Sequence, residues 1–218
     1  MVGKDRITLF ATSIVTVGLC VLVGVRIYRL KHPPMTPVVA SHVAAVNSGD
    51  ASPGHLAGVV TVVAFVDYEC PACRRMVAPL NQLASRYSSQ MRLRIRNFPL
   101  KGHPHAIAAA TAAEAAKQQG LFWPAYEAIF KLNGRLDEPS IRQAMATIGA
   151  DMTRFDTDRK SVGAHTVALD VEAARALSLT YTPGLFLCDP HGQVWRASMV
   201  QQLADALNSG YLAPRPFP

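Results

Sequence analysis

The sequence predicts an α/β domain that follows an N-terminal transmembrane helix. Three observations support this expectation. Residues 59–66 form an apolar, β-branched run typical of a buried strand, helical spacing begins at Pro71 soon after it, and residues 7–25 contain no charge. The chain has 218 residues, which is enough for one domain with its own core and a tail.

Signals for strands and helices continue from residue 58 to residue 210, where we place the domain. Pro71 suits the first turn of a helix, which Pro79 should kink, and Asp189-Pro190-His191-Gly192 indicates a hairpin turn. The expected strands cover about 58–67, 91–98, 184–188 and 193–197, and the expected helices about 71–87, 104–119, 123–132, 138–148, 161–178 and 198–208. This order is that of a thioredoxin-like α/β fold with a helical insertion.

The uncharged run at 7–25 is long enough for one membrane crossing. Its 19 residues, at about 1.5 Å each, just span a hydrocarbon core of about 30 Å. A cleaved signal peptide is the alternative, but no small-x-small site follows closely, and Leu19 is too bulky for lipoprotein processing at Cys20. We therefore expect an uncleaved anchor at 1–31 that inserts 7–25 into the lipid bilayer, a Pro-containing linker at 32–57 and a tail at 211–218.

Cys70 and Cys73 form a Cys-x-x-Cys pair where the first strand ends and the first helix of the domain begins. Unsatisfied N–H groups and the helix dipole stabilise an anion at such an N-terminus. The thiolate, rather than the thiol, attacks disulfides, and Cys73 lies one turn further, within reach to resolve a mixed disulfide. The pair indicates a thiol–disulfide exchange enzyme in which Cys70 is the more exposed thiol with the lower pKa.

The other candidate residues are interpreted structurally. Cys188 is expected as a small buried core residue, Cys20 as part of the membrane segment, and Trp123 as a core residue. His103 and His105 are expected to shape a loop and a helix start. Because no third ligand is in view, we expect no metal site, and the lack of a Gly-rich phosphate loop leads us to expect no cofactor.

The net charge of +7 does not indicate a nucleic-acid partner. Arg92, Arg94 and Arg96 alternate along a predicted strand, which indicates one solvated face of an edge strand, and no aromatic residues are interleaved with them. Much of the net positive charge comes from five basic residues that flank the uncharged run at 7–25, namely Lys4, Arg6, Arg26, Arg29 and Lys31.

Several segments together resemble the DsbA-like thiol–disulfide oxidoreductases, especially their membrane-anchored or exported bacterial members. In the family's order, across about 58–208, they are 65–73 with Cys70-Pro71-Ala72-Cys73, then Asn97-Phe98-Pro99-Leu100, His103-Pro104-His105-Ala106, 122–130 and 174–183. The resemblance implies that Cys70 is the nucleophile and Cys73 the resolving cysteine. It also implies a cis peptide bond at Thr182-Pro183 beside the cysteines, where the backbone can pair with an extended substrate.

One departure from the family concerns proton transfer. Thioredoxin-like proteins often carry a buried carboxylate six residues before the first cysteine, where this chain has Ala64. Asp67 and Glu69 lie on the other side of the strand's alternation or at its end. We therefore expect no buried acid in that role at Cys73, with a water or Glu69 as the substitute.

A second departure concerns oxidising strength. Pro71 and Ala72 carry no charge, whereas the strongly oxidising members have a histidine where Ala72 stands. Glu69, next to Cys70, opposes thiolate formation if it lies close. A less stabilised thiolate makes reduction of the disulfide less favourable, so we expect a milder oxidant.

These observations predict a membrane-tethered thiol–disulfide oxidoreductase that acts on thiols or disulfides of exported proteins and depends on a membrane or soluble redox partner. A reductase or isomerase of the same fold is the close alternative, and a copper-carrying thiol protein or a client-binding protein is the alternative of another class. Positive-inside counting around 7–25 favours a cytoplasmic domain. We nevertheless expect a periplasmic domain on the inner membrane, because disulfide chemistry needs an oxidising compartment.

Overall fold

The computed structural model describes residues 16–27, 34–39, 45–46 and 59–209. The chain divides into two units, 1–35 and 36–218. In the first unit, residues 16–27 form a helix with exposed apolar side chains. Among the described residues, no helix has both the length and the apolar character needed to cross a membrane. Residues 7–15 of the expected anchor lie outside the described residues.

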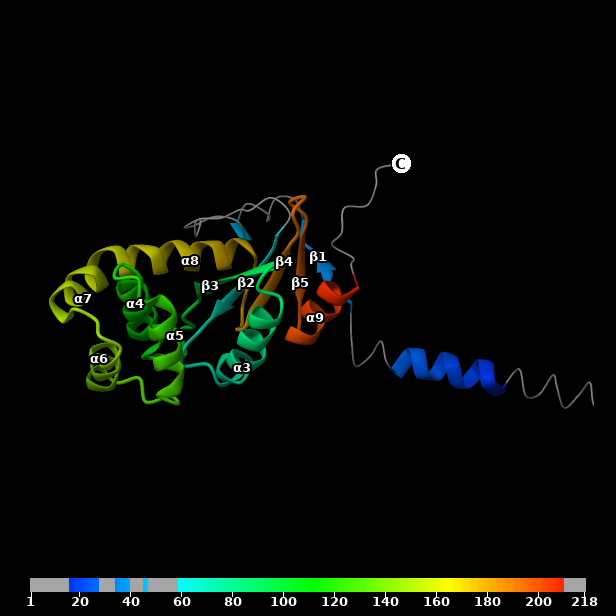
Figure 1. Cartoon of the computed structure of the whole chain (residues 1–218), viewed down its shortest axis with the longest axis horizontal. Coiled ribbons are helices and arrows are strands. Elements are labelled where there is room, and N and C mark those ends of the chain that lie inside the picture. The colour runs from blue at the N-terminus through cyan, green and yellow to red at the C-terminus, as the bar shows by residue number, and fades with distance from the viewer. Residues whose placement is uncertain (1–15, 28–33, 40–44, 47–58, 210–218) are drawn as a thin grey trace, which may run out of the picture. The chain divides into compact units, whose positions relative to one another are not determined.

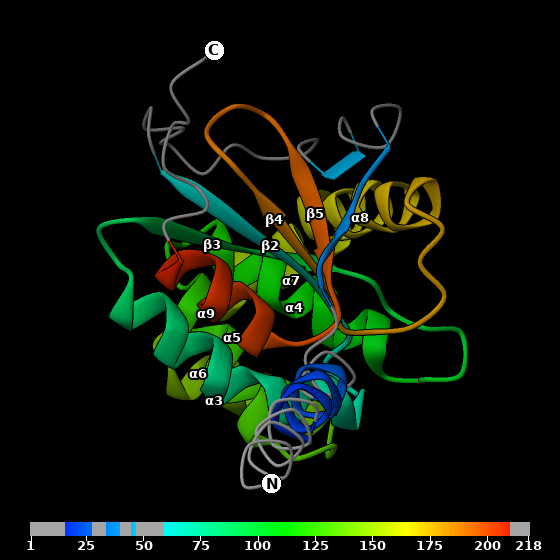
Figure 2. The same cartoon turned by 90° about the vertical axis from the view of Figure 1, so that its right-hand side faces the viewer.

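The second unit is built on a five-stranded mixed sheet in the order β1-β5-β4-β2-β3 (Figure 2). The central strand β2 runs parallel to β3 and antiparallel to β4, and β5 pairs antiparallel with both β4 and β1. The strands are β1 (Thr36–Pro37), β2 (Val60–Val66), β3 (Met91–Asn97), β4 (Gly184–Cys188) and β5 (Val194–Ala197). The four strands expected from the sequence are confirmed to within two residues.

Helices cover both faces of the sheet, and a helical block extends from one end (Figure 1). The helix α3 (Pro71–Arg86) packs beside α9 (Val200–Asn208) on one face, and α8 (Ala164–Ala176) covers the other. The block comprises α4 (Ala106–Lys117), α5 (Phe122–Lys131), α6 (Glu138–Thr147), α7 (Met152–Asp158) and the π-helical turn η1 (Arg159–Gly163). In the sequence, the block follows β3 and precedes β4. This position confirms the thioredoxin-like fold with a helical insertion.

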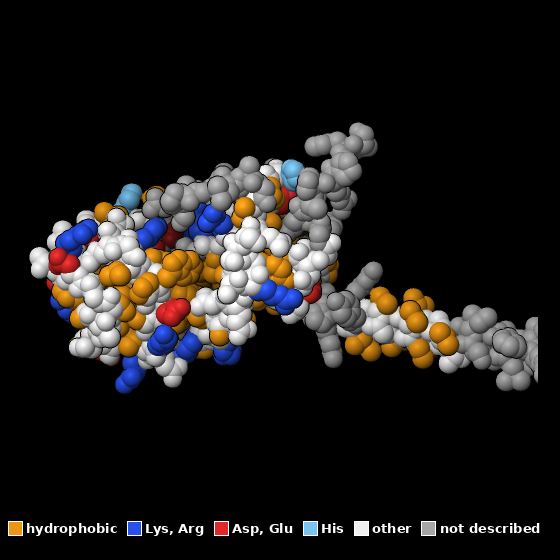
Figure 3. All heavy atoms as spheres, in the orientation of Figure 1, with side chains coloured by type: hydrophobic (Ala, Val, Ile, Leu, Met, Phe, Trp, Pro, Cys, Tyr) orange, Lys and Arg blue, Asp and Glu red, His pale blue; other side chains and the backbone are white. Residues whose placement is uncertain are grey.

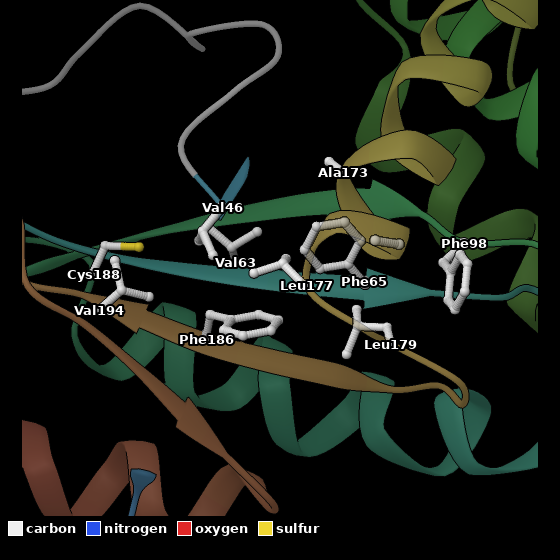
Figure 4. Packing of buried hydrophobic residues seen from close by; sticks show 11 residues of the cluster. Val46, Val63, Phe65, Phe98, Ala173, Leu177, Leu179, Phe186, Cys188 and Val194 are labelled. Atoms are coloured by element: carbon white, nitrogen blue, oxygen red, sulfur yellow. The ribbon is translucent and has the colours of Figure 1, made fainter. Parts of the chain in front are cut away.

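A core cluster fills the space between the sheet and α8 (Figure 4). Phe65 of β2 and Phe186 of β4 meet edge to face, with ring centroids 5.8 Å apart. Leu177, just after α8, packs against them. Cys188 belongs to this cluster and is 3% exposed, as expected for a core residue. Burying one such Phe side chain stabilises the fold by roughly 1.5–3 kcal/mol.

Part of the stretch 32–57, expected as a linker, contributes to the sheet and the core. Thr36 pairs with Arg196 and Pro37 with Trp195, and the N–H of Val38 donates to the Val194 carbonyl at 2.8 Å. Val46 is fully buried. The second unit therefore begins at Thr36 instead of 58. Proline-rich composition indicated a linker, but proline is also tolerated in an edge strand.

The helical block contains a helix that was not expected. Instead of one helix from 161, α7 comes first and joins α8 through the π-helical turn η1. Its N-terminus is capped by the Asp151 carboxylate, which accepts from the N–H groups of Thr153 and Arg154. A Cβ at Gly163 would lie 2.9 Å from the Thr111 carbonyl oxygen, so glycine permits the close approach to α4.

The position of Arg96 differs from the expectation that the alternating arginines form one solvated face. The strand β3 is an edge strand and Arg92 is exposed, as expected, but Arg96 is 1% exposed. Its Nε donates to Asp170 Oδ1 of α8 at 2.7 Å, and its guanidinium lies 5.0 Å from the centroid of the Phe65 ring. The interpretation was wrong for Arg96 because α8 covers this end of the strand.

We expect Asp170→Ala to lower the free energy of unfolding by roughly 3–5 kcal/mol, because it leaves the buried Arg96 guanidinium without this partner. Urea unfolding measures the change. Glu127→Ala, which removes the exposed pair with Lys131, is the control and should change stability by less than about 1 kcal/mol. Equal effects of the two substitutions would contradict the assigned role of Asp170.

Candidate active site

Cys70 occupies the junction between β2 and α3. It is the N-cap of α3 with extended backbone angles (φ −69°, ψ 121°), and Pro71 follows in the first turn. The Cys70 N–H donates to the Asp67 carbonyl at 3.1 Å, and the Cys70 carbonyl accepts from the Arg74 N–H. The strand–turn–helix context expected for the cysteine pair is therefore present, with Cys70 at the positive end of the helix.

The loop that precedes β4 lies against Cys70. The Cys70 Sγ donates to the Thr182 carbonyl oxygen at 3.5 Å, and the Thr182-Pro183 peptide bond is cis, as expected. Cys70 is 7% exposed and Cys73 is 0% exposed. Cys70 is thus the more accessible thiol of the pair, although it is more buried than the sequence suggested.

Cys73 lies behind Cys70 in the protein interior. Burial raises the pKa of the Cys73 thiol to about 12. Two groups oppose this shift: the Asp67 N–H, which donates to Cys73 Sγ at 3.5 Å, and the Thr182 side chain. The nearby Cys70 raises the pKa further. Cys73 is therefore held as a neutral thiol near neutral pH.

Asp67 is a buried carboxylate that the sequence did not indicate for this site. Its side chain is 0% exposed, and Oδ2 lies 2.7 Å from Nδ1 of His103. Oδ2 also accepts from the Leu100 N–H at 2.8 Å, and Oδ1 from the Glu69 N–H at 2.7 Å. The position six residues before Cys70 is the small buried Ala64, as the sequence states.

Glu69, Pro71 and Ala72 surround the pair in different ways. The Glu69 carboxylate accepts from the His105 N–H at 2.8 Å, so it is directed to the loop 98–105. Pro71 is exposed and Ala72 half-buried. The dipeptide between the cysteines is therefore partly exposed to solvent and places no charge beside the two thiols.

An aromatic cluster supports the turn before Cys70. The Tyr68 ring lies 4.8 Å from the Phe130 centroid and 6.2 Å from that of Tyr126. Burial raises the pKa of both tyrosines. Trp123 contacts this cluster but is 44% exposed, so its assignment to the core was wrong. Hydrophobic side chains reach the surface over α4 and α5 (Figure 3), and Trp123 and Ile107 are exposed on these helices.

The sequence indicated Cys70, Cys73, Thr182 and Pro183 as candidates. The fold brings Thr182, which precedes Pro183 in the cis peptide bond, against both cysteines. The sequence did not indicate the Asp67–His103 contact. Among the described residues, no group of three or more His, Cys, Asp or Glu side chains is arranged to hold a metal ion.

Comparisons with known proteins agree with this fold. A family model described as thioredoxin matches residues 47–204. A thioredoxin-like oxidoreductase from Silicibacter pomeroyi DSS-3 superposes with a TM-score of 0.65 and 29% identity, covering 78% of this chain and 98% of that one. The thiol-disulfide exchange protein alpha-DsbA2 from Wolbachia pipientis superposes with a TM-score of 0.63 and 18% identity, covering 76% and 90%.

Curated relatives match only in part. The Na(+)/H(+) antiporter NhaA 1 of Mycolicibacterium gilvum is 32% identical over 152 residues, which is 67% of this chain and 25% of the antiporter. The chain thus spans about a quarter of the length of this relative. The family match spans 47–204, and the structural likeness agrees with it, so we conclude that this chain belongs to the thioredoxin family and has the DsbA-like form of its fold.

Proposed function

We propose that this protein is a thiol–disulfide oxidoreductase that exchanges disulfides with protein substrates through Cys70 and Cys73. The observation that carries the proposal is the asymmetry of the pair. Cys70 stands at the N-terminus of α3 and contacts the Thr182 carbonyl, whereas Cys73 is fully buried one turn behind it. Such an arrangement suits one thiol for attack and the other for resolution.

In the oxidising direction, the enzyme begins with a Cys70–Cys73 disulfide. A substrate thiolate attacks the Cys70 sulfur, and Cys73 leaves and takes up a proton. A second substrate thiolate then attacks the substrate sulfur of the mixed disulfide, which forms the substrate disulfide and releases Cys70. The reduced pair must be reoxidised by a membrane or soluble partner that accepts two electrons.

In the reducing direction the same steps run backwards. The Cys70 thiolate attacks a substrate disulfide and releases one substrate thiol, and Cys73 then loses its proton and attacks Cys70. The Pro71-Ala72 dipeptide between the cysteines brings no positive charge to stabilise the Cys70 thiolate, which supports a mild oxidant. The measured reduction potential decides the direction.

We also propose that the enzyme acts on exported proteins from the periplasmic side of the inner membrane. The uncharged sequence run at 7–25 supports an anchor. Disulfide exchange supports an oxidising compartment. The transport activity named for the curated relatives is not part of the proposal, because the family match at 47–204 accounts for the redox fold alone.

Substitution of the cysteines tests the assigned roles. Cys70→Ser should abolish exchange, because it removes the attacking sulfur. Cys73→Ser should accumulate mixed disulfides with substrate through Cys70, visible as reductant-sensitive adducts on gels. Cys188→Ala serves as the control and should retain turnover within about twofold, since Cys188 lies in the core cluster. Adducts that persist in Cys70→Ser would contradict the assignment.

The pH dependence of resolution follows from the raised pKa of Cys73. Because its thiol has a pKa of about 12, the thiolate fraction should rise about tenfold per pH unit well below that value. The rate at which Cys73 displaces a leaving group from Cys70 should therefore climb from about pH 6 to about pH 9 without a plateau. Stopped-flow measurement of this step is the check, and a plateau near pH 7 would show an ionised Cys73.

Labelling of intact cells tests the location. After mild reduction, a membrane-impermeant maleimide should label Cys70 of the full chain without opening of the inner membrane. Cys70→Ser is the matched control, because it measures the labelling that comes from the exposed Cys20, while Cys73 and Cys188 are buried. Labelling that requires an opened inner membrane would place the domain in the cytoplasm, as the distribution of basic residues around 7–25 suggests.

A further inference from the structure

The backbone of Asp67 contacts both cysteines of the pair. Its carbonyl accepts from the Cys70 N–H at 3.1 Å, and its N–H donates to Cys73 Sγ at 3.5 Å. Both hydrogen bonds, the one to the Cys70 N–H and the one to Cys73 Sγ, therefore depend on the orientation of the peptide groups on either side of Asp67.

The side chain of Asp67 fixes that orientation. The carboxylate is fully buried and is satisfied by three donors from two segments: the Glu69 N–H in its own turn, and the Leu100 N–H and His103 Nδ1 in the loop 98–105. Rotation of the Asp67 backbone would break bonds to a buried charge, which is strongly unfavourable.

A second contact holds the loop 98–105 against the same turn. The Glu69 carboxylate accepts from the His105 N–H at 2.8 Å. The loop is therefore tied to the active-site turn at two points, one buried at Asp67 and one exposed at Glu69. The His103 side chain is 26% exposed, so the buried Asp67 carboxylate is hydrogen-bonded to a residue that itself contacts solvent.

We propose that Asp67 is a positioning residue for Cys73, held by His103 and Leu100, and that it keeps its own N–H on the Cys73 sulfur during resolution. The inference rests on the proposed exchange function. Negative charge develops on Cys73 when it loses its proton to attack Cys70, and the Cys73 side chain is 0% exposed. A hydrogen bond to an ionised group is stronger than one to a neutral group, so the Asp67 N–H acts mainly on the attacking thiolate.

A symmetric aromatic disulfide, dithiobis(nitrobenzoate), separates the two steps. The Cys70 thiolate of the reduced full chain attacks one sulfur, forms a mixed disulfide and releases one thionitrobenzoate. Cys73 then loses its proton and attacks the Cys70 sulfur, which releases the second thionitrobenzoate and leaves the Cys70–Cys73 disulfide. In a full chain whose exposed Cys20 is replaced by serine, the first phase of colour release reports Cys70, and the second reports Cys73.

Asp67→Asn is the decisive variant. Whichever way the amide is oriented, its NH₂ group faces the N–H of Glu69 or that of Leu100, so one hydrogen bond is lost. We expect the second phase to slow about tenfold and the first phase to stay within about twofold. His103→Phe removes one donor and keeps the other two, and should slow the second phase about threefold.

Asp151→Asn is the matched control, because Asp151 also accepts from two backbone N–H groups, at the start of α7. It should leave both phases unchanged. Equal slowing of both phases by Asp67→Asn, or an unchanged second phase, would overturn the inference. If circular dichroism shows that Asp67→Asn does not fold, His103→Phe decides by the same criterion. A chain with Cys20→Ser as its one substitution that releases no thionitrobenzoate would contradict the exchange function and the inference with it.

Discussion

The architecture depends on one buried carboxylate, that of Asp170 in α8. It accepts from the Nε of Arg96 and from the backbone and side-chain N–H groups of Asn97, both at the end of β3. Asn97 in turn donates to Glu114 of α4 at 2.8 Å. This network joins the sheet, α8 and the helical block at one place. The loop 98–105 starts directly after it, so the partners of Asp67 are positioned by the same contacts.

Local pattern was sufficient to predict most of the elements. The β-branched run of β2 and Pro71 at the start of α3 have signals that depend only on neighbouring residues. The burial of Arg96 could not be predicted in this way, because it depends on a helix more than sixty residues later in the chain. The same holds for β1, whose two residues become a strand only through pairing with β5.

At the site, the sequence predicted the cysteine pair and the cis peptide bond but not the environment of Cys73. The alternation of β2 ends at Val66, so it says nothing about where the Asp67 side chain points. His103 lies 36 residues away, and only the folded loop brings it to Asp67. The helix α7 is a different case, since the Asp151 cap was present in the sequence as a local signal and was missed.

The two outer strands of the sheet have a consequence for the proposed exchange with protein chains that are not fully folded. Such chains carry unpaired backbone groups that add readily to an open sheet edge. One edge here is β1, only two residues long and ending in Pro37, which has no N–H to offer. The other is β3, which places the exposed charge of Arg92 outward. Both edges are therefore poorly suited to strand addition, and in the proposed function a protein substrate would contact the cysteine pair and not the sheet edges.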